Sequence, residues 1–300
     1  MTKSFCTLRF CILTHNPGSH FVIRVAESLR KHGHEVRVIN FAHLRLCVRE
    51  GTIRVGQGNE FPDIADSFDA CLARPLSRRD LPTLLFSVNA LSALSKRGLP
   101  VISDPTAYIV AASKLGQYLA LSEHGLPVPD TMSSLDAAGL LGSMQKGTYL
   151  VGKPICGSRG QGVRRILVGD EQYSPPKTVS LYQQDLSGTS FDIRVFTVGY
   201  RTVAAMKRVS SSLAANVSRG GKPERLDLGE GLADLAERAS RATGAEIAGT
   251  DIVIDREGEP HVLEVNAQPD FIGLETVTDA DIPSEISEYV VRRAEEGQNV

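Results

Sequence analysis

The chain lacks the features that would place it in a membrane or on a nucleic acid. It has no tryptophan, and no apolar run reaches the ~18 residues that a membrane-spanning helix needs. The longest apolar run near the N-terminus, 10–14, is too short for the core of a signal peptide. The 33 lysines and arginines nearly balance the 35 aspartates and glutamates, giving a net charge of −2. No overall field draws such a chain to nucleic acid or acidic lipid, so the sequence predicts a cytoplasmic protein with neither partner.

Cysteine is also scarce, and its distribution excludes two classes of small protein. The five cysteines are Cys6, Cys11, Cys47, Cys71 and Cys156. Their number is odd, their spacing is irregular and no C-x-x-C occurs, which argues against a disulfide framework or a zinc knuckle. We expect them to pack as small apolar side chains. The exception is Cys156, which lies in a glycine-rich loop.

What the chain does contain is a regular alternation of strand and helix signals in its first third. With 42% apolar residues in 300, it can build one large core or two to three small ones. The predicted strands are 9–14, 35–41, 69–73 and 100–103, and the predicted helices are 21–32 and 81–96. Strands separated by helices favour a parallel sheet with right-handed crossovers. We assign residues 1–108 to an N-terminal α/β domain.

The remainder of the chain predicts a small α+β unit followed by a mixed-sheet unit. Residues 109–184 carry predicted helices at 112–124 and 136–145 and strands at 149–153 and 164–168. Residues 185–300 carry two predicted hairpins, 192–198 with 202–209 and 250–255 with 260–266. Helices are expected at 231–243 and 283–294. We treat 109–184 as a lid and 185–300 as a catalytic domain.

The second predicted hairpin brings acidic side chains together. A four-residue turn pairs Asp255 with Pro260, and the same register places Asp251 opposite Glu264. Asn266 then faces the same way as Glu264. Two carboxylates and an amide oxygen on one patch suit magnesium or manganese. The alternative is a solvated strand face with incidental acids, but the flanking residues are largely apolar, as in a buried sheet.

The glycine-rich loop is a candidate phosphate site. Its sequence, from Lys153 to Val163, is K-P-I-C-G-S-R-G-Q-G-V. It matches neither the P-loop nor the dinucleotide-binding motif, and it joins two strands. Backbone N–H groups of such a loop can close over phosphate oxygens, with Lys153 and Arg159 supplying charge. The alternative is a flexible hairpin loop without a ligand.

Two further features carry little information alone. Asp192 and Arg194 share one face of a predicted strand, which is also what an ordinary surface ion pair would show. Lys114 lies in a predicted helix, where most lysines are solvated. The seven histidines form no cluster in the sequence.

The order of these motifs resembles the ATP-grasp superfamily and, within it, the RimK-like glutamate ligases. The resemblance covers nearly the whole chain and rests most specifically on E-V-N-x-x-P after a G-x-D strand. The matching segments, in order, are A-S-K-L at 112–115, the glycine-rich loop, Y-Q-Q-D at 182–185, D-x-R at 192–194, R-G-G at 219–221, A-G-T-D at 248–251 and L-E-V-N-A-Q-P at 263–269. It implies an ATP-grasp fold with a parallel N-terminal α/β domain, a lid and a mixed-sheet catalytic domain.

The resemblance also implies roles for individual residues. Lys114 and Lys153 match the lysines that contact ATP phosphates, and 157–162 match the lid over the β- and γ-phosphates. The lid positions are Gly157, Ser158, Gly160 and Gly162, and the adenine hinge is Gln184, Asp185 and Leu186. Asp192 matches the acid that binds ribose. Asp251, Glu264 and Asn266 match the magnesium ligands, the same set that the strand register indicates.

The resemblance also implies where the second substrate binds, which is marked by arginines and one asparagine. Arg208, Asn216 and Arg219 fall near the γ-phosphate and the reacting carboxylate, with Arg194 on a converging segment. Two positions depart from the family pattern. Gln184 stands where glutamate is usual at the hinge, and Ala214 stands where an arginine is usual. The second change removes a positive charge from the substrate side and puts the substrate in question.

The function that the resemblance implies is an ATP-dependent carboxylate–amine ligase. It would use ATP and two magnesium (or manganese) ions to make an acyl phosphate, and would add L-glutamate to an unidentified acceptor. One alternative is an ATP-grasp kinase that phosphorylates a hydroxyl, and another is a nucleotide-binding regulatory subunit. A dinucleotide-binding oxidoreductase is disfavoured because no G-x-G-x-x-G follows the first strand. The sequence is compatible with a homo-oligomer and does not name the acceptor.

Overall fold

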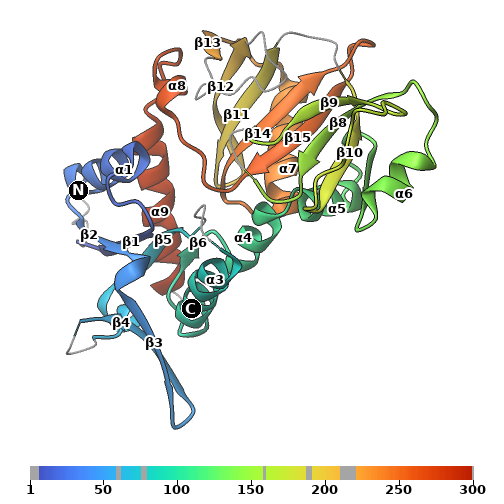
Figure 1. The fold of residues 1–300 in the computed structure, drawn as a ribbon. Helices are drawn as coiled ribbons and strands as arrows, with labels where there is room; N and C mark the ends of the chain where they lie inside the picture. Colours follow the sequence, from blue (N-terminus) through green and yellow to red (C-terminus); the bar gives the residue numbers. More distant parts are fainter. Residues whose placement is uncertain are drawn as a thin grey trace.

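The described part of the chain forms three sheets and a projecting hairpin (Figure 1). The computed structural model describes residues 7–58, 62–75, 80–157, 160–186, 191–209 and 221–298. Within these ranges no helix is both long enough and apolar enough to cross a bilayer.

The N-terminal sheet is parallel, with strand order β2-β1-β5-β6. Its strands are β1 (Arg9–Thr14), β2 (Glu35–Asn40), β5 (Ala70–Arg74) and β6 (Val101–Ile102). Alternate side chains of β1 enter two different cores. Phe10 and Ile12 pack with α1 (His20–Lys31) and α9 (Ile282–Gln298), whereas Cys11 and Leu13 pack with α3 (Leu81–Lys96). Period-two alternation in a strand buried on both faces explains this division.

The lid sheet is small and antiparallel, with order β7-β10-β8-β9. Its strands are β7 (Thr131–Ser134), β8 (Tyr149–Pro154), β9 (Arg164–Leu167) and β10 (Ser180–Gln184). A separate core forms where α6 (Ala137–Gly142) covers the sheet around Leu150, Ile166 and Tyr182.

The C-terminal sheet is antiparallel, with order β13-β12-β11-β14-β15. Its strands are β11 (Phe191–Val198), β12 (Arg201–Val209), β13 (Lys222–Arg225), β14 (Ile247–Ile254) and β15 (Pro260–Asn266). Helix α7 (Glu230–Thr243) packs against the sheet through Leu235, Ala236 and Ala239. The helices α4 (Pro105–Ala112), α5 (Lys114–Glu123) and α8 (Ile272–Glu275) connect the three sheets (Figure 1).

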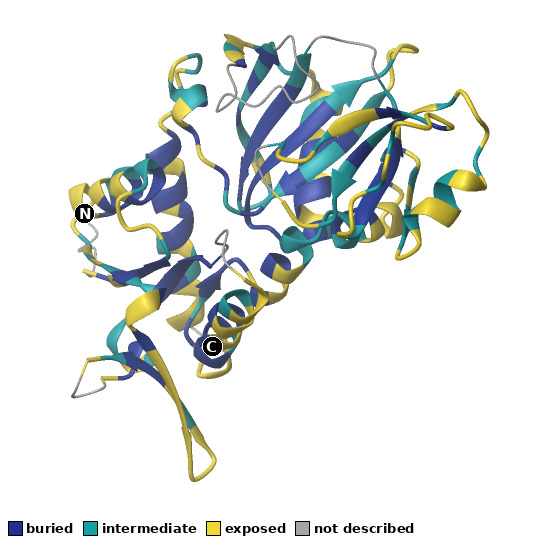
Figure 2. Cartoon of the chain, viewed as in Figure 1, coloured by how far each residue is buried: buried dark blue, intermediate teal, exposed yellow. Residues whose placement is uncertain are grey.

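A two-stranded hairpin projects away from the N-terminal sheet. It consists of β3 (Leu44–Arg49) and β4 (Thr52–Gln57), flanked by the 3-10 helix η1 (Phe41–His43) and by α2 (Ile64–Ser67). Figure 2 shows its exposed tip against the buried strands of the body. Cys47 lies exposed on it and Cys156 is also exposed, so the prediction that the cysteines pack inside is wrong for Cys47 and correct for Cys11 and Cys71. Cys6 lies outside the described residues.

The predicted elements agree with the structure where local signals are strong. The strand at 9–14 and the helix at 81–96 have their predicted bounds. The first hairpin turns at Gly199 and Tyr200, both with positive φ (58° and 64°), which suits the twist of the flanking strands. The helix predicted over 112–124 corresponds to α5 at 114–123. It begins two residues later than predicted because Ser113 adopts an extended conformation and caps α5 by accepting a hydrogen bond from the Gly116 backbone (3.2 Å). Strands β3, β4, β7, β10 and β13 were not predicted.

Candidate active site

The pairing of β14 with β15 places the predicted metal ligands side by side. Asp251 lies opposite Glu264, and Gly249 lies opposite Asn266. The predicted turn register is wrong, because Ile254 rather than Asp255 pairs with Pro260. A bulge between Asp251 and Ile252 absorbs the one-residue difference. Bulges are common near functional sites because they re-aim a side chain, and this one restores the alignment of the two carboxylates.

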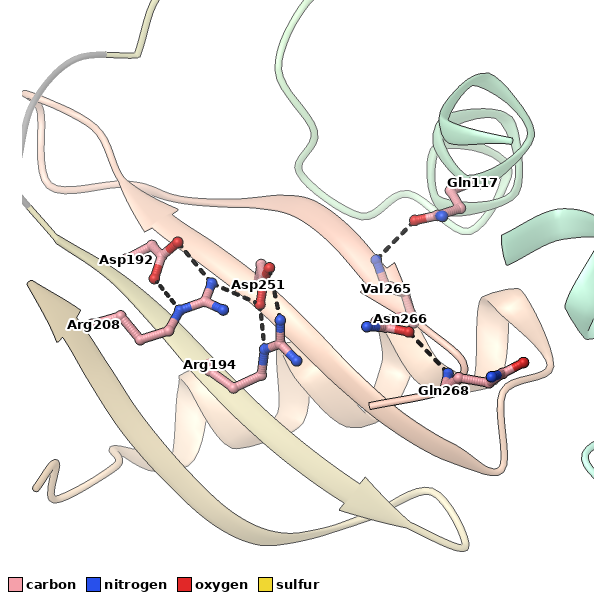
Figure 3. Close-up of polar contacts among 8 residues, drawn as sticks. All are labelled: Gln117, Asp192, Arg194, Arg208, Asp251, Val265, Asn266 and Gln268. Carbon is pink, nitrogen blue, oxygen red and sulfur yellow. Dashed lines mark hydrogen bonds and ion pairs between the residues drawn. The ribbon is translucent and has the colours of Figure 1, made fainter. Parts of the chain in front are cut away.

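Asp251 is held by Arg194 from the adjacent strand β11 and by Arg208 from the next strand, β12 (Figure 3). Nε and Nη2 of Arg194 donate to the two carboxylate oxygens, with Nη2–Oδ2 at 3.0 Å. Nη2 of Arg208 lies 3.0 Å from Oδ1. Arg208 also donates to both oxygens of Asp192, at 2.6 and 2.7 Å. Asp192 and Arg194 therefore do not form the surface ion pair that was the alternative interpretation of D-x-R, since each binds a side chain of an adjacent strand.

The two arginines favour the ionised form of Asp251. Burial opposes ionisation of Asp251, but the guanidinium groups of Arg194 and Arg208 outweigh it and lower the pKa of that carboxyl. Burial disfavours the charged form of Arg208, yet the carboxylates of Asp251 and Asp192 raise its pKa above the ordinary value. The pKa of Asp192 is raised, first by burial and then by the charge of Asp251. The arrangement keeps Asp251 anionic.

Two lysines from different parts of the chain face the same carboxylates. Nζ of Lys114, at the start of α5, lies 3.8 Å from a carboxylate oxygen of Glu264, whose side chain is 34% exposed. Lys153, half-buried on β8 of the lid sheet, interacts electrostatically with Glu264, Lys114 and Asp251. Burial, reinforced by the charge of Lys114, lowers the pKa of Lys153 to about 8. An anion between the two lysines would offset their repulsion.

Helix α5 is fixed on β15 by two side chains that the sequence analysis did not single out. Oε1 of Gln117 accepts a hydrogen bond from the backbone N–H of Val265 at 2.8 Å (Figure 3). The hydroxyl of Tyr118 donates to the carbonyl of Leu263 at 2.5 Å. These bonds hold Lys114 over the strand that carries Glu264. Gln117 and Tyr118 follow Lys114 by three and four residues, but no local pattern marks them as contacts of a distant strand.

The glycine-rich loop begins against the same helix. The backbone N–H of Lys114 donates to the carbonyl of Ile155 at 2.9 Å, and its Nζ donates to the carbonyl of Gly157 at 2.8 Å. Gly160 and Gly162 have φ values of 65° and 74°, which a side chain would strain. The start of the loop thus lies beside a lysine that the family resemblance assigns to ATP.

The predicted adenine hinge follows β10. The backbone N–H of Gln184 donates to the carbonyl of Asp130 at 2.9 Å, and Asp185 accepts a hydrogen bond from Nε of Arg165 at 2.5 Å. Leu186 is partly buried. The predictions for Ser158, Asn216 and Arg219, with the departure at Ala214, lie outside the described residues.

The predicted magnesium ligands fit a hard divalent cation. All three offer oxygen, as magnesium prefers. Asp251 accepts hydrogen bonds at both oxygens, yet a carboxylate has about four acceptor sites. Oδ1 of Asn266 accepts one bond, from the backbone N–H of Gln268 at 2.9 Å, and has a second lone pair. In the described ranges, no three histidines, cysteines or acids cluster as a metal site, and the set proposed here combines two acids with an amide.

Comparison with known proteins agrees with this geometry. Residues 114–290 match the family model described as a RimK-like ATP-grasp domain. The chain is 30% identical over 302 residues to a protein of Hahella chejuensis (strain KCTC 2396) named "Probable alpha-L-glutamate ligase 1", covering 96% of each. It is 26% identical over 305 residues to a "Probable alpha-L-glutamate ligase" of Legionella pneumophila (strain Corby), again covering 96% of each.

Solved structures show the same fold. The ATP-grasp ligase PsnB, solved with minimal precursor, Mg and ADP, superposes with a TM-score of 0.71 at 21% identity, covering 95% of this chain and 98% of that one. A RimK domain ATP-grasp protein from Sphaerobacter thermophilus DSM 20745 gives a TM-score of 0.67 at 19% identity, covering 94% and 99%. The predicted ATP-grasp architecture is confirmed. The chain belongs to the RimK-like ATP-grasp family and is an ATP-dependent ligase.

Proposed function

We propose that the protein is an ADP-forming carboxylate–amine ligase that joins L-glutamate to an acceptor through an acyl phosphate. The observation that carries the proposal is the convergence of Lys114 from α5 and Lys153 from the lid sheet on Glu264 and Asp251 of the C-terminal sheet. Glutamate as the amino acid rests on the names of the relatives that are 26 and 30% identical.

The charges at the site suit a polyanion bound together with a cation. Two lysines and two arginines surround Asp192, Asp251 and Glu264, so the group has one positive charge in excess. Lys114 and Lys153 would bind phosphate oxygens, and the start of the glycine-rich loop would close over them. Asp251, Glu264 and Asn266 would hold magnesium, which when bound would offset the charge that builds up during phosphoryl transfer.

The substrate side of the site would rely on arginine. Nε and Nη2 of Arg194 and Arg208 are used within the network, while Nη1 of each donates to no protein group among the described residues. A guanidinium held this way can present a fixed donor to a carboxylate or to the oxyanion formed when an amine attacks the acyl phosphate. We assign this role to Arg208, because its ion pairs with Asp192 and Asp251 fix the orientation of its guanidinium.

The experiment that tests the function is ADP release across a panel. Purified protein with ATP and Mg²⁺ is assayed with each common amino acid, crossed with acceptors that include peptides, carrier-protein tails and small amine or carboxylate coenzymes. The proposal predicts ADP release that requires both L-glutamate and an acceptor, with a product heavier by one or more glutamyl residues. ADP release with a phosphorylated product and no amino-acid dependence would instead establish the kinase alternative.

A further inference from the structure

Arg74, the last residue of β5, is a buried cation outside the network described above. It is 8% exposed, and its guanidinium carbon lies 3.8 Å from the centroid of the Phe21 ring. Within the described ranges, no carboxylate lies within 4.0 Å of it as an ion-pair partner. Its Nη1 donates to the carbonyl of Pro269 at 3.2 Å, and its Nη2 donates to the carbonyl of Gln268 at 3.3 Å. Burial lowers the pKa of Arg74 to about 10, and the negative charge of Asp270, which forms no direct ion pair with it, acts in the opposite direction.

A buried cation whose direct hydrogen-bond partners are neutral carbonyls destabilises a core, even with the charge of Asp270 acting on it from beyond ion-pair distance. Removing a charge from water costs several kcal/mol, and a carboxylate is the partner that usually offsets it. An apolar side chain stacked on Phe21 would fill this space without that cost. The retention of a guanidinium here therefore indicates that the two carbonyls need to be held.

The two carbonyls belong to the loop that orients Asn266. Gln268 accepts from Arg74 through its carbonyl, while its backbone N–H donates to Oδ1 of Asn266 at 2.9 Å (Figure 3). One residue thus links the arginine to the amide of a proposed metal ligand. Arg74 belongs to the N-terminal sheet and Asn266 ends β15 of the C-terminal sheet, so the contact also joins two sheets.

From this arrangement we infer that Arg74 is a positioning residue, which fixes the loop at 268–269 and through it the amide oxygen of Asn266 for the metal. The inference rests on the proposed function, because it takes Asn266 as a magnesium ligand. A guanidinium is suited to the task, since its planar fork can bind two adjacent carbonyls at once, whereas lysine offers a single ammonium. Outer residues that orient ligands typically contribute 10–100-fold to metal affinity.

The test measures metal affinity and stability separately. Free Mn²⁺ is followed by its electron paramagnetic resonance signal while it is titrated into full-length protein saturated with ADP. Arg74→Met and Arg74→Lys should each raise the dissociation constant of Mn²⁺ at least about 10-fold. Arg74→Lys keeps the charge and serves if Arg74→Met does not fold. The control is Arg97→Met, which removes an arginine that binds the backbone carbonyl of Ile53 at 3.2 Å and the carboxylates of Asp63 and Asp66. All of these groups lie in the N-terminal third of the chain, and none of these described residues contacts the loop at 268–269.

The outcomes distinguish a failure of the positioning role of Arg74 from a failure of the proposed function. Arg97→Met should lower the melting temperature and leave the affinity for Mn²⁺ at the wild-type value. If the folded Arg74 variants also lose stability yet bind Mn²⁺ as wild type does, Arg74 is only a brace between sheets and the inference is rejected. If the wild-type protein binds no Mn²⁺ in the presence of ADP, the proposed function itself fails.

Discussion

Glu264 is the proposed metal ligand with the fewest contacts to other protein groups. Asp251 is engaged by Arg194 and Arg208, and Asn266 is engaged by Gln268, whereas the contact of Glu264 with Lys114 is long at 3.8 Å. Its carboxylate is also one-third exposed, with a side-chain value of 34%. Substitution at Glu264 therefore changes the site with little cost to the fold.

We predict that Glu264→Ala abolishes Mn²⁺ binding to the ADP complex and reduces ADP release at least about 100-fold, because magnesium loses a charged ligand. Its melting temperature should stay within a few degrees of wild type. The comparison variant is Glu257→Ala, an exposed glutamate in the turn of the same hairpin, which should keep both activities. Near-normal turnover by folded Glu264→Ala protein would remove Glu264 from the site.

A second prediction at the residue scale concerns Lys153 and pH. Its folded pKa of about 8 lies below the ordinary value of 10.5, so the folded protein binds fewer protons than the unfolded chain between these values. Stability contributed by this group therefore rises with pH from about 8 to 10.5, and at pH 7 the buried charge is destabilising. Lys153→Met should raise the melting temperature of the ligand-free protein at pH 7. It should also reduce the increase of melting temperature with pH that the wild-type protein shows above pH 8.

The same substitution should cost function, since Lys153→Met removes a proposed phosphate ligand. The apparent affinity for ATP should fall at least about 10-fold, as the loss of a charge-assisted hydrogen bond implies. The exposed Lys177 provides the control, because Lys177→Met should change neither quantity. A melting temperature for Lys153→Met that is lower at pH 7, with an unchanged pH profile, would contradict the assignment.

At the scale of elements, local signals predicted several strands, whereas their pairing and register depend on packing against neighbouring strands. The hairpin of β14 and β15 was predicted, and so was the pairing of Asp251 with Glu264. The bulge beside this pair was not, because no glycine or other local signal distinguishes the extra residue, Leu263, in V-L-E of β15. Strands β7 and β10 were missed because their hydrophobic alternation is short and their partners are distant in the sequence.

Gly249 of β14 packs closely against Arg194 of β11, so a larger residue at this position should disturb both strands. Gly249 lies opposite Asn266, and a Cβ added there would lie 2.4 Å from Nη1 of Arg194 and 3.0 Å from Cβ of Pro269. Gly249→Ala should displace Arg194 from Asp251, lower the free energy of unfolding by about 1–3 kcal/mol and weaken Mn²⁺ binding. Both effects are measured on the same sample by thermal denaturation and by the Mn²⁺ titration.

The control for this prediction is Gly231→Ala in α7, where an added Cβ meets nothing within 4 Å. Because alanine favours a helix over glycine, this variant should be as stable as wild type or more so. If Gly249→Ala behaved like Gly231→Ala in both measurements, the packing of Arg194 against β14 would have no bearing on the metal site.

At the scale of the whole molecule, the site joins residues that are remote in the sequence. Lys114, Lys153 and Glu264 come from three segments, and the order of motifs along the chain indicated that they meet. The arginine network was only partly predictable. The sequence placed Arg194 and Arg208 near the reacting groups, but their carboxylate partners depend on which strands lie side by side. No pattern in the sequence indicates the role of Arg74, because its partners are backbone carbonyls 194 and 195 residues further along the chain.

The proposed ligase activates a carboxylate as an acyl phosphate, and isotope transfer tests this most directly. Two parallel reactions use ATP, Mg²⁺, L-glutamate and an acceptor that supports ADP release, with ¹⁸O in the carboxylates of glutamate in one and of the acceptor in the other. Attack by a carboxylate on the γ-phosphorus, followed by amine displacement, leaves one carboxylate oxygen in the phosphate. We predict one ¹⁸O in inorganic phosphate for each ADP formed in one of the two reactions. ADP formed with no ¹⁸O in the phosphate of either reaction would contradict the account.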